Sequence, residues 1–117
     1  MSEPDPSDLP FCYLTTTGRR TGRPHRIEIW FGCGEGVVYM LSGDEDRSDW
    51  VRNILANPAV SLQIGSRTES TTARVVVDRG EDQLARRAVA DKYRRRGEVD
   101  LDEWEASALP VAVDWSG

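Results

Sequence analysis

The sequence predicts an α+β, mainly β fold: a small antiparallel split β-barrel of about six strands, with two or three helices packed outside. Three observations predict it. Short runs rich in β-branched and aromatic residues are separated by Gly- and Pro-containing turns, and apolar residues at helical spacing occur mainly in two places. The chain has 117 residues, enough for one domain with its own core. We expect a flexible N-terminal tail at residues 1–9 and a single barrel domain at 10–117.

The first half of the chain is expected to form three strands joined by short turns. Residues 11–17 are rich in β-branched and aromatic side chains, and two glycines and a proline mark a turn at 18–24. Residues 25–31 alternate apolar and polar side chains, as expected of a half-buried strand. A turn at 32–36 then leads to a nearly all-apolar strand at 37–41. Connections this short favour an antiparallel meander.

The second half of the chain is expected to contain more helix. Ser48 can cap a short helix, and Asn57-Pro58 is a stop signal for it. A longer helix is predicted over 81–96, where Leu84 belongs to an apolar side and arginines cover the other side. The remaining elements are an acidic loop at 42–47, strands at 60–64, 70–78 and 109–115, and a short helical piece around Trp104.

Composition excludes several classes of function. A net charge of −5 argues against nucleic acid as a partner. No apolar run approaches the roughly 20 residues of a membrane span, and the acidic, Pro-rich start is unlike a signal peptide, so we expect a cytoplasmic location. Cys12 and Cys33 lack CxxC spacing, and His25 is the single histidine. We therefore expect neither a disulfide framework nor a metal site.

The strongest local signal for binding is the basic turn at residues 18–26, which carries four arginines, Thr21 and two glycines. Glycines allow a backbone nest whose N–H groups point at an anion, and arginines form charge-assisted hydrogen bonds to phosphate or carboxylate. The alternative is a charged hairpin tip in water. The residues alone favour neither.

Three further side chains have both a structural and a functional interpretation. Ser42 either hydrogen-bonds a ligand or only stabilises a turn. Trp50 either forms the wall of a planar site or packs in the core. Tyr93 either donates its hydroxyl to a substrate or is half-buried with an exposed tip.

Three stretches in this order resemble the deazaflavin-dependent nitroreductase family: LTTTGRRTGRP at 14–24, YMLS at 39–42 and WVRNILANPAV at 50–60. The first and third are specific as a pair, and the resemblance covers roughly residues 11–117. It implies a split β-barrel similar to pyridoxamine-phosphate-oxidase-like flavin-binding proteins, and it implies the deazaflavin coenzyme F-420.

The resemblance also implies residue roles. Arg19, Arg20 and Thr21 would hold the phosphate region of the coenzyme, and His25 and Arg26 would extend that contact. Ser42 and Tyr93 would be catalytic hydroxyl groups, as proton donors. The remaining residues implied in the cofactor pocket are Ile27, Ile29, Trp30, Met40, Leu41, Gly43, Asp49, Trp50 and Asn53, together with Ser42.

The leading hypothesis is an oxidoreductase that uses reduced F-420 as hydride donor to a small acceptor such as a quinone, a nitroaromatic compound or an activated alkene. The coenzyme would carry the electron chemistry, which fits the few catalytic side chains of the sequence. One alternative is an FMN-binding barrel of the same shape, and another is a non-catalytic binder of a small anionic cofactor. Related barrels often pair, so a homodimer is possible.

Overall fold

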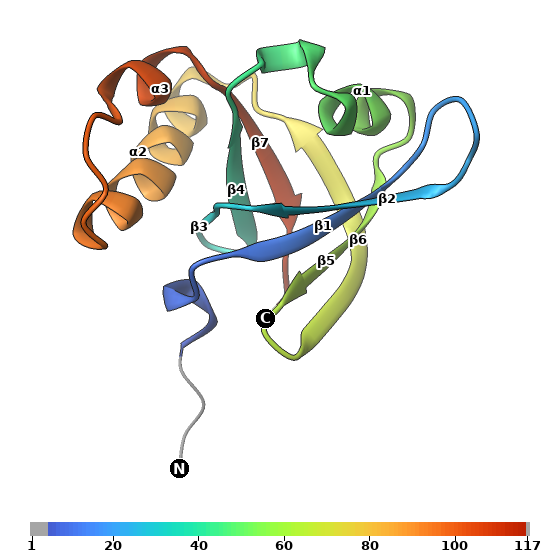
Figure 1. The fold of residues 1–117 in the computed structure, drawn as a ribbon, viewed down its shortest axis with the longest axis horizontal. Helices are drawn as coiled ribbons and strands as arrows, with labels where there is room; N and C mark the ends of the chain where they lie inside the picture. The colour runs from blue at the N-terminus through green and yellow to red at the C-terminus, as the bar shows by residue number, and fades with distance from the viewer. Residues whose placement is uncertain (1–4, 117) are drawn as a thin grey trace.

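The computed structural model describes residues 5–116, and over that range it confirms the mainly β class: a curled antiparallel sheet of seven strands with three α-helices outside it (Figure 1). The extra strand relative to the expected six contains two residues. The strands are β1 (Cys12–Thr17), β2 (Pro24–Ile29), β3 (Gly32–Cys33), β4 (Val37–Ser42), β5 (Ala59–Ile64), β6 (Arg67–Val75) and β7 (Leu109–Asp114). The helices are α1 (Asp49–Ala56), α2 (Arg79–Arg95) and α3 (Asp102–Ser107), with 3-10 turns η1 (Pro6–Asp8) and η2 (Glu45–Arg47).

The strand order is β2-β1-β5-β6-β7-β4-β3, so the expected meander of the first three strands is wrong. β1 and β2 form a hairpin in which Cys12 lies opposite Ile29. β4 instead pairs with β7 and β3 at the other end of the sheet. Buried Phe31 lies in the connection between the two ends. Because β4 is almost wholly buried, it needs a strand on each side, and a place beside β2 at the sheet edge would not provide that.

Two local differences from the predicted elements have a clear cause. β3 lies inside the segment expected to be a turn, because Gly32 packs directly on α2; a Cβ at Gly32 would be 2.4 Å from the Ala88 carbonyl oxygen. β6 starts at Arg67 and ends at Val75 rather than covering 70–78. Gly65, at φ +61°, makes the turn from β5 tight enough for Ile64 to pair with Arg67.

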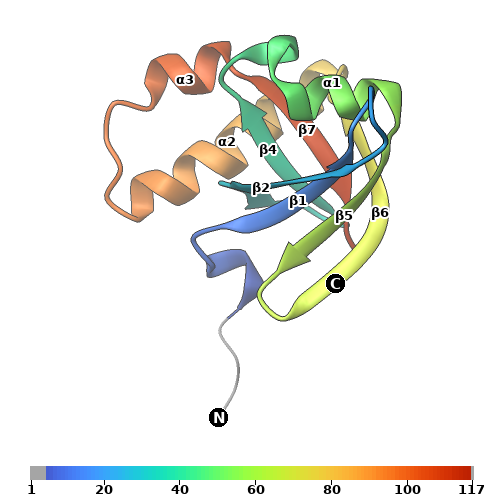
Figure 2. The ribbon, with the colours of Figure 1, turned by 45° about the vertical axis from the view of Figure 1, so that its right-hand side comes forward.

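The core has two parts. One fills the inside of the curled sheet and includes Leu14, Phe31 and Met40, all fully buried. The other lies between the sheet and the helices α2 and α3, which Figure 2 shows on one side of it. Leu84, expected on the apolar side of the long helix, is 55% exposed, because the face of α2 that packs on the sheet is centred on Val89.

Residues 8 and 9 of the expected N-terminal tail contact the domain through their backbone carbonyls. Lys92 Nζ donates to the Leu9 carbonyl at 2.7 Å, and Arg96 donates to the Asp8 carbonyl at 2.9 Å. Residues 1–4 of the expected tail lie outside the described residues. Among residues 5–116, every helix is too short or too polar to cross a membrane.

Candidate functional site

The basic turn between β1 and β2 is a closed loop of backbone hydrogen bonds. Gly18 N donates to Arg23 O at 2.8 Å, and Gly22 N donates to Gly18 O at 2.8 Å. Gly22 has φ +74°, a conformation that only glycine adopts at little cost. The His25 ring lies on Gly18, where a Cβ would be 2.7 Å from Nε2. The glycines therefore set the shape of the turn and bring His25 over it.

Asn53 of α1 fixes this turn to the domain. Its side chain is 1% exposed, and its Oδ1 accepts hydrogen bonds from Arg19 N at 3.2 Å and from Arg19 Nη1 at 2.9 Å. Its Nδ2 donates to Oγ1 of buried Thr16 at 3.1 Å. Arg19 Nη2 also reaches Asp49 Oδ1 at 3.1 Å. The first arginine of the turn is thus held in one orientation by the helix that follows the acidic loop.

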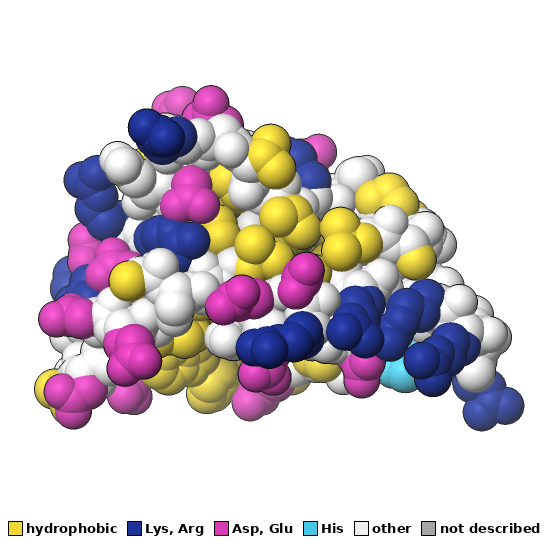
Figure 3. Space-filling view, turned by 90° about the horizontal axis from the view of Figure 1, so that it is seen from above, with side chains coloured by type: hydrophobic (Ala, Val, Ile, Leu, Met, Phe, Trp, Pro, Cys, Tyr) yellow, Lys and Arg dark blue, Asp and Glu magenta, His cyan; other side chains and the backbone are white. Residues whose placement is uncertain are grey.

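A cavity of about 210 Å³ lies between the turn and α1. Within residues 5–116, Arg20 has neither an ion pair nor a side-chain hydrogen bond, so its guanidinium is available to a ligand. Figure 3 shows basic side chains gathered beside the histidine, with exposed hydrophobic side chains next to them on the same face. The residues that line the cavity are Gly18, Arg19, Arg20, Thr21, His25, Asp49 and Asn53.

The remaining candidate residues of β2 lie on two opposite faces of the strand. His25, Ile27 and Ile29 share one face, and both isoleucines pack against the core inside the sheet. Arg26 lies on the opposite face, where it donates to Gln63 Oε1 at 3.1 Å and covers the Tyr13 ring at 4.3 Å. The expected continuation of the phosphate contact from His25 to Arg26 is therefore not found.

The β4 candidates are mostly buried. Met40 is fully buried and Leu41 is 5% exposed. The Ser42 hydroxyl donates to Glu45 O at 2.8 Å and lies 3.0 Å from the Ser48 hydroxyl, so it stabilises the turn into α1. Gly43 is exposed, and a Cβ there would have only the Trp104 ring within 4 Å.

Tyr93 is a core residue rather than a hydroxyl with an exposed tip. Its side chain is 2% exposed, and its hydroxyl donates to Pro10 O at 2.8 Å and accepts from Phe31 N at 3.0 Å. Burial raises the pKa of Tyr93 to about 12. A hydroxyl in this position is not directed at a ligand, so the proposed proton-donor role has no support in the structure.

Trp30, Tyr93 and Trp104 form an aromatic cluster that the sequence patterns do not reveal. Trp30 stacks on Tyr93 with ring centroids 4.0 Å apart, and it meets the Trp104 ring edge-on at 5.8 Å. Trp50, by contrast, is half-buried against the core inside the sheet. Sequence analysis also missed Thr16, whose contact with Asn53 joins positions 37 residues apart.

The chain is similar to reductases that depend on reduced F420. An F420H(2)-dependent quinone reductase of Mycobacterium tuberculosis is 23% identical over 112 residues, which cover 92% of this chain and 74% of that protein. A solved F420-H2 dependent reductase superposes with a TM-score of 0.71 at 24% identity, covering 91% of this chain and 94% of the other. A chain described as a domain-swapped dimer superposes with a TM-score of 0.72 at 24% identity, covering 92% and 81%.

The family model of the F420H(2)-dependent quinone reductases matches residues 6–114. That range contains the whole curled sheet, the basic turn and α1. The chain belongs to the F420H(2)-dependent quinone reductase family.

Proposed function

We propose that this protein is an oxidoreductase that binds reduced F420 at the basic turn and reduces quinones. The observation that carries this proposal is the cavity in which Arg20, Thr21 and His25 face a ligand space while Asn53 holds Arg19 in place. Membership of the quinone reductase family supports both the coenzyme and the class of acceptor.

The side chains of the turn fit the anionic part of the coenzyme. Arg20 is unpaired within the described residues, and the Thr21 oxygen only accepts a hydrogen bond, from Arg23 N at 3.2 Å, so its O–H is free to donate. A cavity of about 210 Å³ suits one phosphate-sized group, since whole small-molecule sites are usually larger, roughly 300–1,000 Å³. The ring system would then lie outside the cavity, on the adjacent hydrophobic surface of Figure 3.

The chain's own residues provide binding and orientation. When bound, reduced F420 supplies the hydride for quinone reduction. Arg20, Thr21 and His25 would hold the anionic end, while Gly43 and Trp50 would border the ring. We propose water as the proton source, because the hydroxyls of Ser42 and Tyr93 are both engaged inside the protein.

Equilibrium titration with F420 tests the site. The double variant Arg19→Ala, Arg20→Ala should weaken binding by about 3 kcal/mol, because two charge-assisted contacts are lost. Arg23→Gln is the control: it removes one positive charge from the same turn at an exposed position outside the cavity. Equal affinity of the double variant and the control would reject the turn as the binding site.

Parallel titrations with FMN and steady-state assays separate the alternatives. Oxidation of reduced F420 with menadione as acceptor should saturate in both substrates. Tighter binding of FMN than of F420 would favour the flavin-dependent alternative. Tight F420 binding with no turnover on any quinone would favour a non-catalytic carrier.

We also propose that the protein forms a homodimer. Within residues 5–116, β2 ends the sheet with an edge that pairs with no other strand, and exposed strand edges favour pairing with another strand. The structural neighbour described as a domain-swapped dimer supports this. Light scattering across a concentration series should give twice the 13.1 kDa chain mass, and a mass of one chain at every concentration would reject the dimer.

A further inference from the structure

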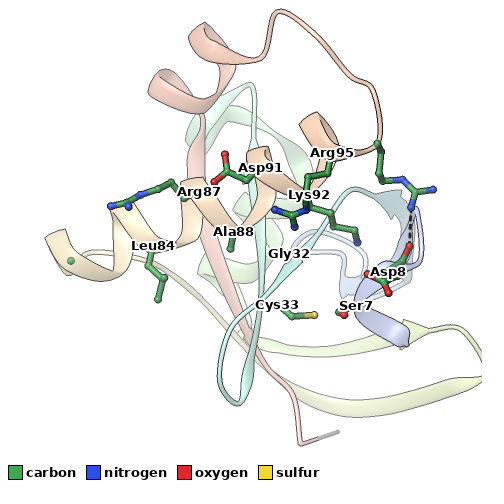
Figure 4. Close-up of a pocket in the computed structure, with 12 residues that line it drawn as sticks. Ser7, Asp8, Gly32, Cys33, Leu84, Arg87, Ala88, Asp91, Lys92 and Arg95 are labelled. Atoms are coloured by element: carbon green, nitrogen blue, oxygen red, sulfur yellow. Dashed lines mark hydrogen bonds between the residues drawn. The ribbon is translucent and has the colours of Figure 1, made fainter. Parts of the chain in front are cut away.

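A second hollow lies between α2, β3 and η1, on elements that take no part in the basic turn. Its volume is about 870 Å³, which is within the range of small-molecule sites. Figure 4 shows Lys92 and Arg95 extending from α2 toward the space above Cys33, whereas Arg87 extends away from them. We call this hollow the α2 groove; its lining is Ser7, Asp8, Gly32, Cys33, Gly80, Leu84, Arg87, Ala88, Asp91, Lys92, Arg95 and Arg96.

The cations of the α2 groove lack carboxylate partners within residues 5–116. Within that range, the Lys92 ammonium donates a hydrogen bond to the backbone carbonyl of Leu9, and the Arg96 guanidinium donates one to the backbone carbonyl of Asp8. Some arginines elsewhere do form ion pairs, for example Arg74 with Glu81 at 2.7 Å. Unpaired cations in a protein with an excess of five negative charges indicate a place suited to an external anion.

Lys92 is a buried charged side chain in the lining of the groove. The residue is 6% exposed, its Nζ lies 3.5 Å from the centre of the Phe31 ring, and only one of its three N–H groups is used by Leu9 O. Burial lowers the pKa of Lys92 to about 8, and the nearby Asp8 carboxylate offsets this only in part. An anion in the groove would add favourable charge beside the ammonium.

The same groove has an apolar wall. Gly32 lies flat against Ala88, Leu84 is 55% exposed, and the thiol of Cys33 is free and exposed. The two carboxylates of the lining do not cancel the cations, because Asp91 is paired with Arg94 at 2.9 Å and Asp8 alone faces the groove unpaired.

We propose that the α2 groove binds a small organic anion that carries an apolar ring, with Lys92, Arg95 and Arg96 holding its charged group. The ring would lie against Leu84, Ala88 and Cys33. This site is separate from the proposed coenzyme site, since the two share no lining residue.

Cys33 provides a local probe of the groove's charge. Its thiolate reacts with an aromatic disulfide to form a mixed disulfide and release one thiolate of the reagent. The rate with anionic 5,5′-dithiobis(2-nitrobenzoate) is divided by the rate with neutral 4,4′-dithiodipyridine, so that changes in access cancel. Cys12 is fully buried and reacts slowly, and a Cys33→Ser variant gives the background.

The rate ratio should fall about fivefold or more in the double variant Arg95→Gln, Arg96→Gln. Arg79→Gln, on the same helix but outside the groove, should leave it unchanged. An unchanged ratio in the double variant, or an equal fall in the control, would overturn the proposed anion preference.

A ligand of the proposed class should protect Cys33. Reaction with the neutral disulfide should slow saturably with 1-anilinonaphthalene-8-sulfonate, and much less with N-phenyl-1-naphthylamine, which has the same rings without the sulfonate. Protection should persist in Arg20→Gln, which excludes binding at the turn as its cause. Absence of protection, or equal protection by the neutral compound, would overturn the proposal.

Discussion

The two basic regions of this molecule hold their cations in different ways. At the turn, Arg19 is fixed by four contacts to α1, through Asn53 and Asp49, and Arg20 beside it has no side-chain partner among residues 5–116. In the α2 groove, Arg95 has no side-chain partner among the described residues, and the Lys92 ammonium contacts a backbone carbonyl and the rings of Phe31 and Tyr93. One region is preorganised by buried polar side chains, and the other by burial of a single ammonium.

This difference predicts different binding behaviour. A preorganised donor set loses little side-chain freedom when an anion arrives, which favours affinity and a fixed ligand orientation. The α2 groove has exposed arginines that must be ordered by the ligand, which favours weaker binding of a broader class. Mutations of the residues that fix each region test this difference.

The largest effect is expected for Asn53→Ala. The substitution leaves the Thr16 hydroxyl and the Arg19 amide without their partner, and both lie in or beside the buried network. We expect a loss of about 3 kcal/mol in unfolding free energy, measured by urea denaturation, together with weaker F420 binding. Asn57→Ala, at an exposed position after the same helix, should cost less than about 1 kcal/mol. Equal losses of unfolding free energy in the two variants would show that the hydrogen bonds of Asn53 do not hold the turn in place.

Gly18→Ala should have the next largest effect. The added Cβ would meet His25 Nε2 at 2.7 Å and the Arg23 carbonyl oxygen at 3.0 Å, so the ring or the turn must move. We expect about 2 kcal/mol of destabilisation and a weaker F420 titration. In a His25→Ala background the cost should shrink, because the closer contact has gone. The same cost in both backgrounds would mean that His25 does not rest on the turn.

Lys92 predicts a pH dependence of stability. Its folded pKa of about 8 is below the ordinary 10.5, so the unfolded chain binds more protons between these values and unfolding free energy rises with pH there. Tyr93, with its pKa raised to about 12, opposes this only above its ordinary pKa of 10. Between pH 8 and 10, wild type should gain about 1–2 kcal/mol relative to Lys92→Met in urea denaturation. Parallel curves would show that burial does not lower the pKa of Lys92 in the folded protein.

Local patterns predicted the strands and the basic turn because those features depend on residues close in sequence. β-Branched and aromatic composition predicted β1, alternation predicted β2, and the glycines bracketed the turn between them. The route of the chain from β2 to β4 was not predictable from such patterns, because it depends on the burial of Phe31 inside the barrel and on the pairing of β4 with β7. Short connections favoured a meander of the first three strands, but the burial of β4 beside the distant strand β7 decides the observed strand order.

The candidate site was predictable in its residues more than in their roles. The turn motif led to Arg19, Arg20 and His25, which the structure brings together. Register was not available from the motif, so Arg26 was expected beside His25 although neighbouring strand residues point to opposite faces. Tyr93 was misjudged because its two hydroxyl partners are backbone groups far away in sequence, which leave no pattern.

The smallest expected effect concerns Asp49, the carboxylate at the rim of the anion cavity. Its side chain is 82% exposed and pairs with Arg19, which Asn53 already holds, so Asp49→Asn should change stability by less than about 1 kcal/mol. Removing a negative charge beside a bound anion should strengthen F420 binding by about threefold at low salt, and screening should erase the gain in salt. The control Asp46→Asn, in the acidic loop and outside the cavity, should have less effect. Weaker binding in Asp49→Asn would instead show that the Asp49 carboxylate, and not Asn53 alone, orients Arg19, which would make the turn less preorganised than its buried network indicates.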